Sequence, residues 1–252
     1  MRTFRVIPCL CLDDDYFVKT EGFRAPRYLG DPLNILRIFN EKIVDEIVIL
    51  DITKGRSSPN FSLLKRLVSQ TFVPLSYGGS VRTFEHAAKL INCGFEKIIV
   101  GRTAFQNPAI VESIAREFGT QAVIVSIDIL ESPDANSFVC KYAMGQGNQI
   151  TIDEAISIFQ DLGAGEVLLQ DVERDGRLVG QNTKLFSKLK EKSTIPILYG
   201  GGVRDIEDMQ IVKNAGFQGV SVGAAFVYVG RLNGVLINYP SQQDLDEHLS
   251  HL

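Results

Sequence analysis

The stretch Pro74-Leu75-Ser76-Tyr77-Gly78-Gly79-Ser80-Val81-Arg82 returns 122 positions later as Pro196-Ile197-Leu198-Tyr199-Gly200-Gly201-Gly202-Val203-Arg204, and this repetition decides the fold. Val44–Asp51 likewise resembles Ala164–Asp171, 120 positions later. Two shorter pairs recur at a separation of 122: Gly94-Phe95 as Gly216-Phe217, and Val100-Gly101 as Val222-Gly223. A period of half the chain is too long for a solenoid. The repeat therefore predicts two similar halves, about residues 1–120 and 121–252.

Short runs rich in β-branched residues alternate with longer amphipathic stretches through both halves. The runs predict eight strands: Phe4–Leu12, Glu46–Asp51, Val73–Tyr77, Lys97–Gly101, Ala122–Ile129, Glu166–Asp171, Ile195–Tyr199 and Gly219–Gly223. The stretches predict helices over Pro32–Glu41, Phe61–Ser69, Phe84–Cys93, Ala109–Phe118, Ile152–Leu162, Thr183–Lys190 and Ile206–Ala215. Apolar strands separated by helices are typical of a parallel sheet that helices cover. Eight such units predict one α/β domain over residues 1–252, a (β/α)8 or TIM barrel with a two-fold internal repeat.

Composition narrows the classes of partner. The net charge is −4, from 26 Lys and Arg against 30 Asp and Glu, which argues against nucleic acid as the main ligand. No apolar stretch reaches the length of a membrane span, and Met1–Cys11 lacks a signal-peptide cleavage pattern, so we expect a cytoplasmic protein. The four cysteines (Cys9, Cys11, Cys93 and Cys140) are expected to be thiols, and their spacing predicts neither a metal site nor another cofactor.

Glycine-rich turns follow two strands in each predicted half. Glycine lets the backbone approach a ligand closely, and free amides at helix starts attract anions. In (β/α)8 enzymes the loops after strands 7 and 8 commonly bind phosphate, and the repeat doubles that arrangement. Two sites predict a substrate with a phosphate at each end. The predicted phosphate-binding residues are Gly79, Ser80, Arg102 and Thr103 in the first half, and Asp175, Gly176, Gly201, Gly202, Gly223 and Ala224 in the second.

Segments spread from Arg5 to Tyr228 resemble the cyclase subunit of imidazole glycerol phosphate synthase, from histidine biosynthesis. The segments are Arg5–Leu10, Asp31-Pro32, Asp45–Thr53, Phe118–Val123, Gly163–Glu166 and Arg174-Asp175-Gly176. The sister isomerase of that pathway shares the barrel and both phosphate sites, but the last two segments favour the cyclase. The resemblance implies a lyase that closes an imidazole ring and releases an aminoimidazole carboxamide ribotide. It also implies a glutaminase partner, docked at the N-terminal face of the barrel, whose ammonia travels through the barrel to a phosphorylated small-molecule substrate.

The resemblance also implies a gate of four charged residues where ammonia enters the barrel. The matching positions are Arg5, Glu46, Lys97 and Glu166, each at or near the start of a predicted strand. Two positive and two negative side chains can pair where water is excluded. The alternative is a salt-bridge cluster that only stabilises the fold, since charges at this end of a barrel ordinarily serve stability.

The family's acid–base chemistry is assigned to two aspartates, at the ends of strands 1 and 5. Asp128 matches the second of them, whereas Cys11 stands in the place of the first. The internal repeat pairs the same two positions, at an offset of 117, and strand alternation points Cys11 into the site opposite Asp128. A thiol is mostly neutral at pH 7, so ordinary cyclase chemistry is in doubt. Lys19, which matches a lysine in the family's mobile first loop, is expected to lower the pKa of Cys11 when that loop closes.

Three functions fit these features. The first is the histidine-pathway cyclase, working with Cys11 in a variant acid–base pair, or with a carboxylate from Asp13, Asp14 or Asp15. The second is a paralogous subunit that delivers ammonia to another substrate, such as a sugar in amidino-sugar assembly for surface polysaccharides. The third is a non-catalytic ammonia conduit that activates the glutaminase. The polar insertion Glu131–Gln149, after the fifth strand, predicts a mobile lid or hairpin over the site.

Overall fold

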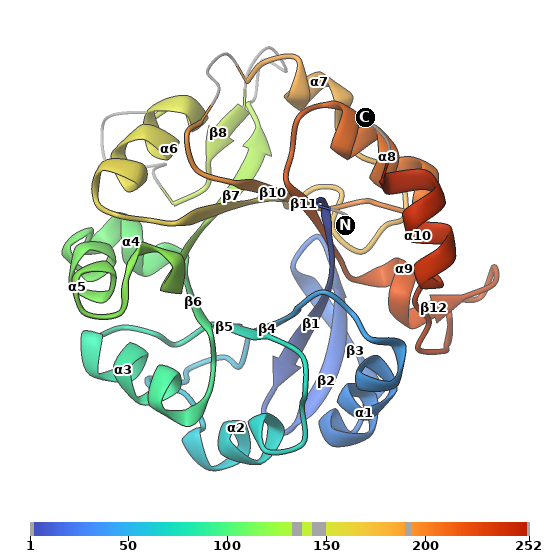
Figure 1. Cartoon of the computed structure of the whole chain (residues 1–252), viewed down its shortest axis with the longest axis horizontal. Helices are drawn as coiled ribbons and strands as arrows, with labels where there is room; N and C mark the ends of the chain where they lie inside the picture. The colour runs from blue at the N-terminus through green and yellow to red at the C-terminus, as the bar shows by residue number, and fades with distance from the viewer. Residues whose placement is uncertain (1–2, 133–137, 143–149, 190–192, 251–252) are drawn as a thin grey trace.

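The computed structural model describes residues 3–132, 138–142, 150–189 and 193–250. Within them, eight parallel strands close into a barrel, because β11 pairs with β1 as well as with β10 (Figure 1). In order around the barrel the strands are β1 (Arg5–Asp13), β4 (Ile47–Asp51), β5 (Leu75–Gly78), β6 (Lys97–Val100), β7 (Val123–Glu131), β9 (Glu166–Asp171), β10 (Ile197–Gly200) and β11 (Gly219–Val222). The predicted (β/α)8 barrel is confirmed.

Helices lie on the outside of the barrel and lead from each strand to the next (Figure 1). They are α1 (Pro32–Lys42), α2 (Phe61–Val68), α3 (Phe84–Cys93), α4 (Arg102–Gln106), α5 (Ala109–Phe118), α6 (Ile152–Asp161), α7 (Thr183–Phe186), α8 (Ile206–Asn214), α9 (Ala224–Val227) and α10 (Gln242–Leu249), with a 3-10 turn, η1 (Thr120–Ala122). Side chains cap the starts of α1, α2, α3, α6, α7, α8 and α10, and Thr151 and Glu154 form a reciprocal capping box at α6. The helix predicted over Thr183–Lys190 is shorter than expected, since α7 ends at Phe186.

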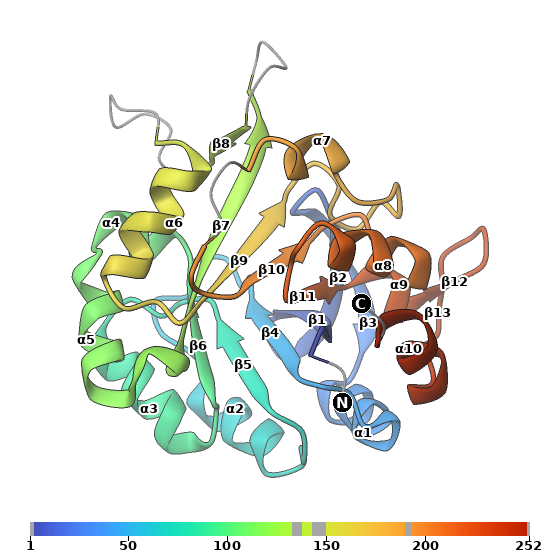
Figure 2. The ribbon, with the colours of Figure 1, turned by 45° about the horizontal axis from the view of Figure 1, so that its top comes forward.

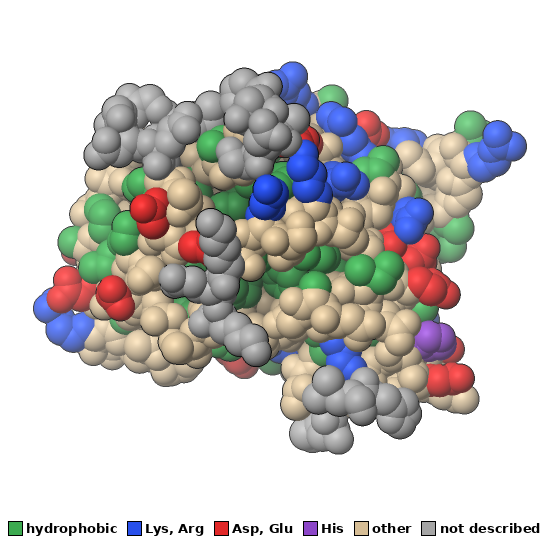
Figure 3. Space-filling model, turned by 90° about the horizontal axis from the view of Figure 1, so that it is seen from above, with side chains coloured by type: hydrophobic (Ala, Val, Ile, Leu, Met, Phe, Trp, Pro, Cys, Tyr) green, Lys and Arg blue, Asp and Glu red, His purple; other side chains and the backbone are tan. Residues whose placement is uncertain are grey.

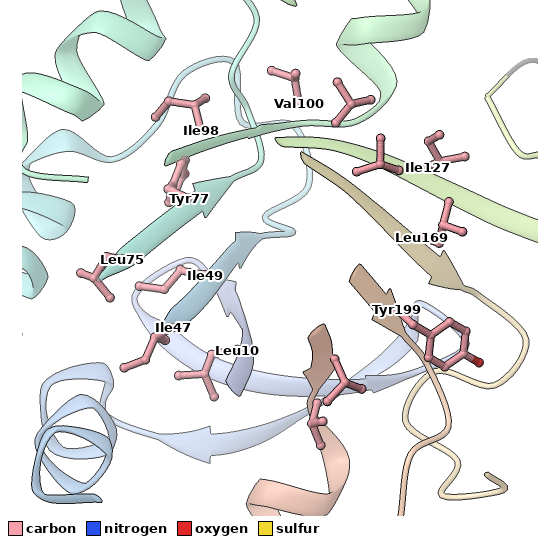
Figure 4. Close-up of a cluster of buried hydrophobic side chains, with 14 of the residues drawn as sticks. Leu10, Ile47, Ile49, Leu75, Tyr77, Ile98, Val100, Ile127, Leu169 and Tyr199 are labelled. Carbon is pink, nitrogen blue, oxygen red and sulfur yellow. The ribbon is translucent and has the colours of Figure 1, made fainter. Parts of the chain in front are cut away.

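Side chains alternate between the two faces of the barrel strands. The outer face packs against the helices, and ten of its residues form the ring of apolar side chains labelled in Figure 4, from Leu10 on β1 to Tyr199 on β10. The inner face carries a separate apolar layer, made of Ile7, Val48, Ile99, Ile124, Leu168 and Leu198. Because Leu10 faces outward, its neighbours Cys9 and Cys11 face the barrel interior, as the sequence predicted.

Three short hairpins add to the barrel. Strand β1 continues into β2 (Tyr16–Glu21) and β3 (Arg24–Gly30), which extend the sheet in antiparallel fashion. Strand β7 pairs in the same way with β8 (Phe138–Cys140), so the described part of the insertion Glu131–Gln149 forms a hairpin; residues 133–137 and 143–149 lie outside the described residues. The pair β12 (Tyr228–Val229) and β13 (Gly234–Val235) forms a separate hairpin before α10. In Figure 2 the β7–β8 hairpin rises at the rim toward which the strands point.

Among the described residues, no helix combines the length and apolarity that crossing a membrane requires.

Candidate active site

The four predicted gate residues form a closed ring at the N-terminal end of the barrel. Arg5 donates to Glu46 and to Glu166 at 2.9 Å each, and Lys97 contacts the same two carboxylates at 3.0 and 2.9 Å. Ser76 on β5 adds a hydrogen bond of 2.5 Å to Glu46. The Glu46 side chain is only 3% exposed, so it is the most shielded member. These carboxylates raise the pKa of Arg5 despite its burial, so Arg5 stays charged. We call these four residues the charged ring.

Residues on the inner face of β1 lie at successive levels of the barrel interior, from its N-terminal end to its C-terminal end. Arg5 belongs to the charged ring and Ile7 to the apolar layer, while Cys9 and Cys11 line a pocket that opens at the C-terminal end. A path from the charged ring to the pocket therefore crosses the apolar layer.

The pocket lies on the side of the second half-barrel. Its lining combines glycine turns with a few polar side chains: Cys9, Cys11, Lys19, Gln170, Asp175, Gly176, Gly201, Gly202, Ser221, Gly223 and Ala224, with Phe23, Leu50, Leu178, Val203 and Val222. Five of the six residues predicted for the second phosphate site are glycine or alanine here, and the sixth is Asp175. A side chain at Gly202 is excluded, because its φ is +81° and a Cβ there would lie 2.2 Å from the Gly180 carbonyl oxygen.

A salt bridge closes one side of the pocket. Lys19, from β2, donates to both carboxylate oxygens of Asp175 at 2.9 Å, and the backbone amide of Gly22 donates to the Asp175 carbonyl at 2.9 Å. Lys19 is 4% exposed although it carries a charge. The turn after β9 is thus tied to the β2–β3 hairpin.

The two pocket thiols are held in their protonated form. Burial raises the pKa of Cys11, although the nearby Lys19 ammonium acts in the opposite direction. Burial raises the pKa of Cys9 to about 12. The expectation that Lys19 would lower the pKa of Cys11 holds only for its own contribution, because burial outweighs it. Cys11 can therefore donate a proton at neutral pH, but a buried neutral thiol is a poor base.

Asp128 ends the inner face of β7 and is covered by the β7–β8 hairpin. Its carboxylate lies 4.0 Å from the Lys141 ammonium and within reach of the Tyr142 hydroxyl. The Arg102 guanidinium stacks on the Tyr142 ring, 5.1 Å from its centroid. Burial raises the pKa of Asp128, while Tyr142, Lys141 and Arg102 each lower it. A carboxyl whose pKa is raised by burial is a candidate proton donor or acceptor.

The first predicted phosphate site looks different from the second. None of Gly79, Ser80, Arg102 and Thr103 is among the residues that line the pocket. Ser80 instead donates to the Arg56 carbonyl at 3.4 Å, and the Arg102 side chain is directed to Tyr142. Arg56 extends to Asp14 (3.1 Å) and Asp51 (3.6 Å). The two halves thus differ in that the pocket lies beside the second, although each holds an arginine next to its buried aspartate: Arg56 by Asp51, and Arg174 by Asp171 at 3.7 Å.

Three loop carboxylates were alternatives for the missing aspartate, and two of them interact with other side chains. Asp14 pairs with Arg56, and Asp15 accepts a hydrogen bond of 3.3 Å from Asn60. Asp13 is the last residue of β1 and lies close enough to Cys11 to raise its pKa.

The internal repeat extends to a buried pair in each half that the sequence analysis did not single out. Asp51 accepts a hydrogen bond of 2.9 Å from the Tyr77 hydroxyl. At the equivalent place Asp171 and Tyr199 are bridged by Asn182, which donates to Asp171 at 2.8 Å and to the Tyr199 hydroxyl at 3.1 Å. Both tyrosines lie in the repeated stretches, which was the signal for them. Lys141, Tyr142 and Ser221 had no such signal, because their place depends on tertiary packing.

Basic side chains gather near the open end of the barrel. In the view of Figure 3, Lys and Arg side chains lie along the upper edge, over the region around α7. Lys184 of α7, which pairs with Glu131, belongs to this end of the barrel. A surface of this sign attracts anionic ligands to the end where the pocket opens.

The chain is similar to known proteins along most of its length. The family described as "Histidine biosynthesis protein" matches residues 5–233. A "Putative imidazole glycerol phosphate synthase subunit HisF" of Leptospira interrogans is 37% identical over 244 residues, covering 95% of this chain and 96% of that protein. A protein named "Putative imidazole glycerol phosphate synthase subunit hisF2" in Pseudomonas aeruginosa is 35% identical, covering 96% and 98%. The "Imidazole glycerol phosphate synthase subunit HisF" of Streptomyces griseus is 31% identical, covering 88% and 89%. The chain belongs to the histidine biosynthesis protein family, as a barrel similar to its HisF subunits.

Proposed function

We propose that the protein is a synthase subunit of the imidazole glycerol phosphate synthase type. Ammonia from a glutaminase partner enters through the charged ring, crosses the apolar layer and attacks a phosphorylated substrate in the pocket. The observation that carries the proposal is the order of Arg5, Ile7, Cys9 and Cys11 along one strand, which joins the ring to the pocket through an apolar interior.

Backbone amides of the pocket turns would bind the substrate, and side chains would transfer protons. The turns at Gly201-Gly202 and Gly223-Ala224 would hold one phosphate of the substrate. Asp128 of β7, which lies outside the pocket lining, would take or give a proton at the reacting centre, since burial raises its pKa. Cys11 would act only as a proton donor.

The first candidate reaction is ring closure on the bis-phosphorylated ribulosyl intermediate of histidine biosynthesis, which gives imidazole glycerol phosphate and an aminoimidazole carboxamide ribotide. The test supplies purified protein with this intermediate and an ammonium salt, and follows imidazole glycerol phosphate. Turnover above the no-enzyme rate supports this reaction, and its absence rules it out.

The second candidate is ammonia delivery to a different substrate, such as a sugar in amidino-sugar assembly. One observation favours it: a protonated thiol, Cys11, stands where the ring-closing chemistry would use a carboxylate. If the Cys11→Asp variant converts the histidine intermediate and the native chain does not, the scaffold binds that substrate and Cys11 directs the native chain to another. Calorimetry with a nucleotide-sugar then separates this candidate from the non-catalytic conduit, which would show no heat.

The ammonia path has its own test, because it needs the partner subunit. In the complex with its glutaminase, Lys97→Met opens one side of the charged ring by removing two of its four ion pairs. We expect glutamine hydrolysis to become uncoupled from product formation, while turnover from added ammonium salt persists. Equal coupling in the native and Lys97→Met complexes would leave the charged ring with a role in stability alone.

A further inference from the structure

Ser221 is a buried polar residue at the inner end of the pocket. It is 4% exposed and belongs to the pocket lining. Its hydroxyl oxygen has no hydrogen-bond partner of normal geometry among the described residues, although the hydroxyl lies close enough to Cys9 to interact weakly with its sulfur. Native proteins rarely leave a buried hydroxyl unpaired, and a hydroxyl that faces a pocket is usually satisfied by what the pocket holds.

The fold does not require a hydroxyl at this position. The half-barrel repeat that pairs Val222-Gly223 with Val100-Gly101 places Ile99 at the position equivalent to Ser221. Ile99 belongs to the apolar layer and packs there. The barrel therefore tolerates an apolar side chain at this position in the first half. The serine in the second half is not needed for packing, so we expect a role in binding.

The strand register places Ser221 at the boundary between the apolar layer and the pocket. On one side it pairs with Ile7 of the apolar layer, and on the other with Gly200 of β10. Gly200 in turn pairs with the pocket residue Gln170. A small molecule that crosses the apolar layer from the charged ring meets the Ser221 hydroxyl as its first polar group on this side.

The charges around Ser221 favour a neutral ligand. The neighbouring Cys9 thiol is a weak hydrogen-bonding group and, with a pKa of about 12, stays neutral. The Lys19 ammonium lowers the pKa of Cys9, but it is already paired with Asp175, which raises that pKa. Because these two charges are paired with each other, neither is free to neutralise a charged ligand at Ser221, and an unpaired charge is costly to bury.

We propose that Ser221, beside Cys9, is a binding site for neutral ammonia at the inner end of the pocket. The Ser221 oxygen accepts one N–H of ammonia, which leaves the nitrogen lone pair directed toward the substrate above. The proposal rests on the proposed function only in that ammonia reaches this end of the barrel.

The test is a titration with ammonium chloride followed by ¹⁵N–¹H spectra of deuterated, ¹⁵N-labelled protein. Potassium chloride at equal ionic strength serves as the salt control. At alkaline pH we expect saturable shifts confined to residues around Ser221, with a dissociation constant on the order of 0.1 M, the best that a ligand of one heavy atom reaches. At neutral pH, where ammonium dominates, the apparent affinity falls in proportion to the neutral fraction.

Two variants make the result specific. Ser221→Ala removes a hydroxyl that has no protein partner, so its melting temperature should be unchanged or higher, and the ammonia shifts should vanish. Ser126→Ala removes another buried serine from the barrel interior, outside the pocket lining, and should keep the shifts. Shifts that persist in Ser221→Ala, fail to saturate, or appear equally with potassium chloride overturn the site. In each of those cases Ser221 binds only water.

The two proposals fail separately. Ammonia binding at Ser221 without turnover of any phosphorylated substrate contradicts the proposed function and leaves this site standing. Ammonium-driven turnover that Ser221→Ala leaves unchanged, together with unaltered shifts, contradicts this site and leaves the proposed function standing.

Discussion

Lys19 and Asp175 lie 156 positions apart in the sequence, yet the Lys19 ammonium is 2.9 Å from both oxygens of the Asp175 carboxylate. The pair joins the β2–β3 hairpin to the turn after β9, across the mouth of the pocket. A buried ion pair of this kind stabilises a structure less by its attraction than by the cost of leaving one member alone.

Asp175→Asn leaves the buried Lys19 without its counterion. We expect the free energy of unfolding to fall by about 2–3 kcal/mol, and the pKa of Lys19 to fall because burial is no longer opposed. Denaturant titration measures the first effect, and hydrogen exchange in Tyr16–Gly30 reports release of the hairpin. Glu173→Gln, an exposed carboxylate of the same turn, is the control and should change neither. Equal stability of Asp175→Asn and the native protein would contradict a structural role for the pair.

Gly202→Ala tests the backbone geometry of the second phosphate site. The φ of +81° and the close Gly180 oxygen make any Cβ at this position strained, and the turn must shift. We expect a loss of about 2 kcal/mol or more and loss of the stabilisation that inorganic phosphate gives in thermal unfolding. Gly216→Ala is the matched control, since its φ is +96° but nothing lies within 4 Å of a Cβ. It should cost about 1 kcal/mol and keep the phosphate effect. Phosphate stabilisation that survives Gly202→Ala would move the anion site elsewhere.

Asp128→Asn should change the pH dependence of stability. Burial raises the pKa of Asp128 in the folded state above its unfolded value. The folded protein therefore binds this proton more tightly, and the free energy of unfolding falls as pH rises from the ordinary carboxyl pKa through the raised one. Since asparagine does not titrate, the melting temperature of Asp128→Asn relative to the native protein should rise as the pH increases above the ordinary carboxyl pKa of about 3.9. Asp161→Asn, an exposed carboxylate at the end of α6, should show no such trend. A constant difference across this range would mean that the pKa of Asp128 is ordinary.

The order in which the cysteines react tests whether Cys11 is a proton donor or a nucleophile. Burial raises the pKa of Cys11, which is 7% exposed, whereas Cys93 lies half-buried on α3. At about pH 8 we expect iodoacetamide to modify Cys93 faster than Cys11 by about tenfold or more, because the thiolate is the reacting form. Peptide mass spectrometry over a time course measures both rates. Preferential modification of Cys11 would show a thiolate in the pocket and a nucleophilic role instead.

The local sequence predicts the bounds of those helices and strands whose hydrophobic pattern lies within their own residues. The bounds predicted for α3, α5 and β9 match the structure, because apolar periodicity marks all three and Thr83 caps the start of α3. The β2–β3 hairpin was taken for a loop, although the turns at Asp14 and Gly22, both with positive φ, are the signal that could have found it. Helix α7 is shorter than predicted, because the apolar pattern does not show where the helix stops packing against the barrel.

The barrel, its two-fold repeat and the family could be predicted from the sequence alone, because they depend on the period of apolar residues and on motifs that stay together along the chain. The sequence also identified the members of the charged ring and the inward face of Cys11. Only the folded structure shows that the pocket lies beside the second half, that Lys19 pairs with Asp175, and that burial raises the pKa of Cys11. It also shows that the Ser221 hydroxyl lies in the pocket lining without a hydrogen bond of normal geometry among the described residues. Burial and pairing are properties of residues brought together from distant parts of the chain, and the local pattern does not contain them.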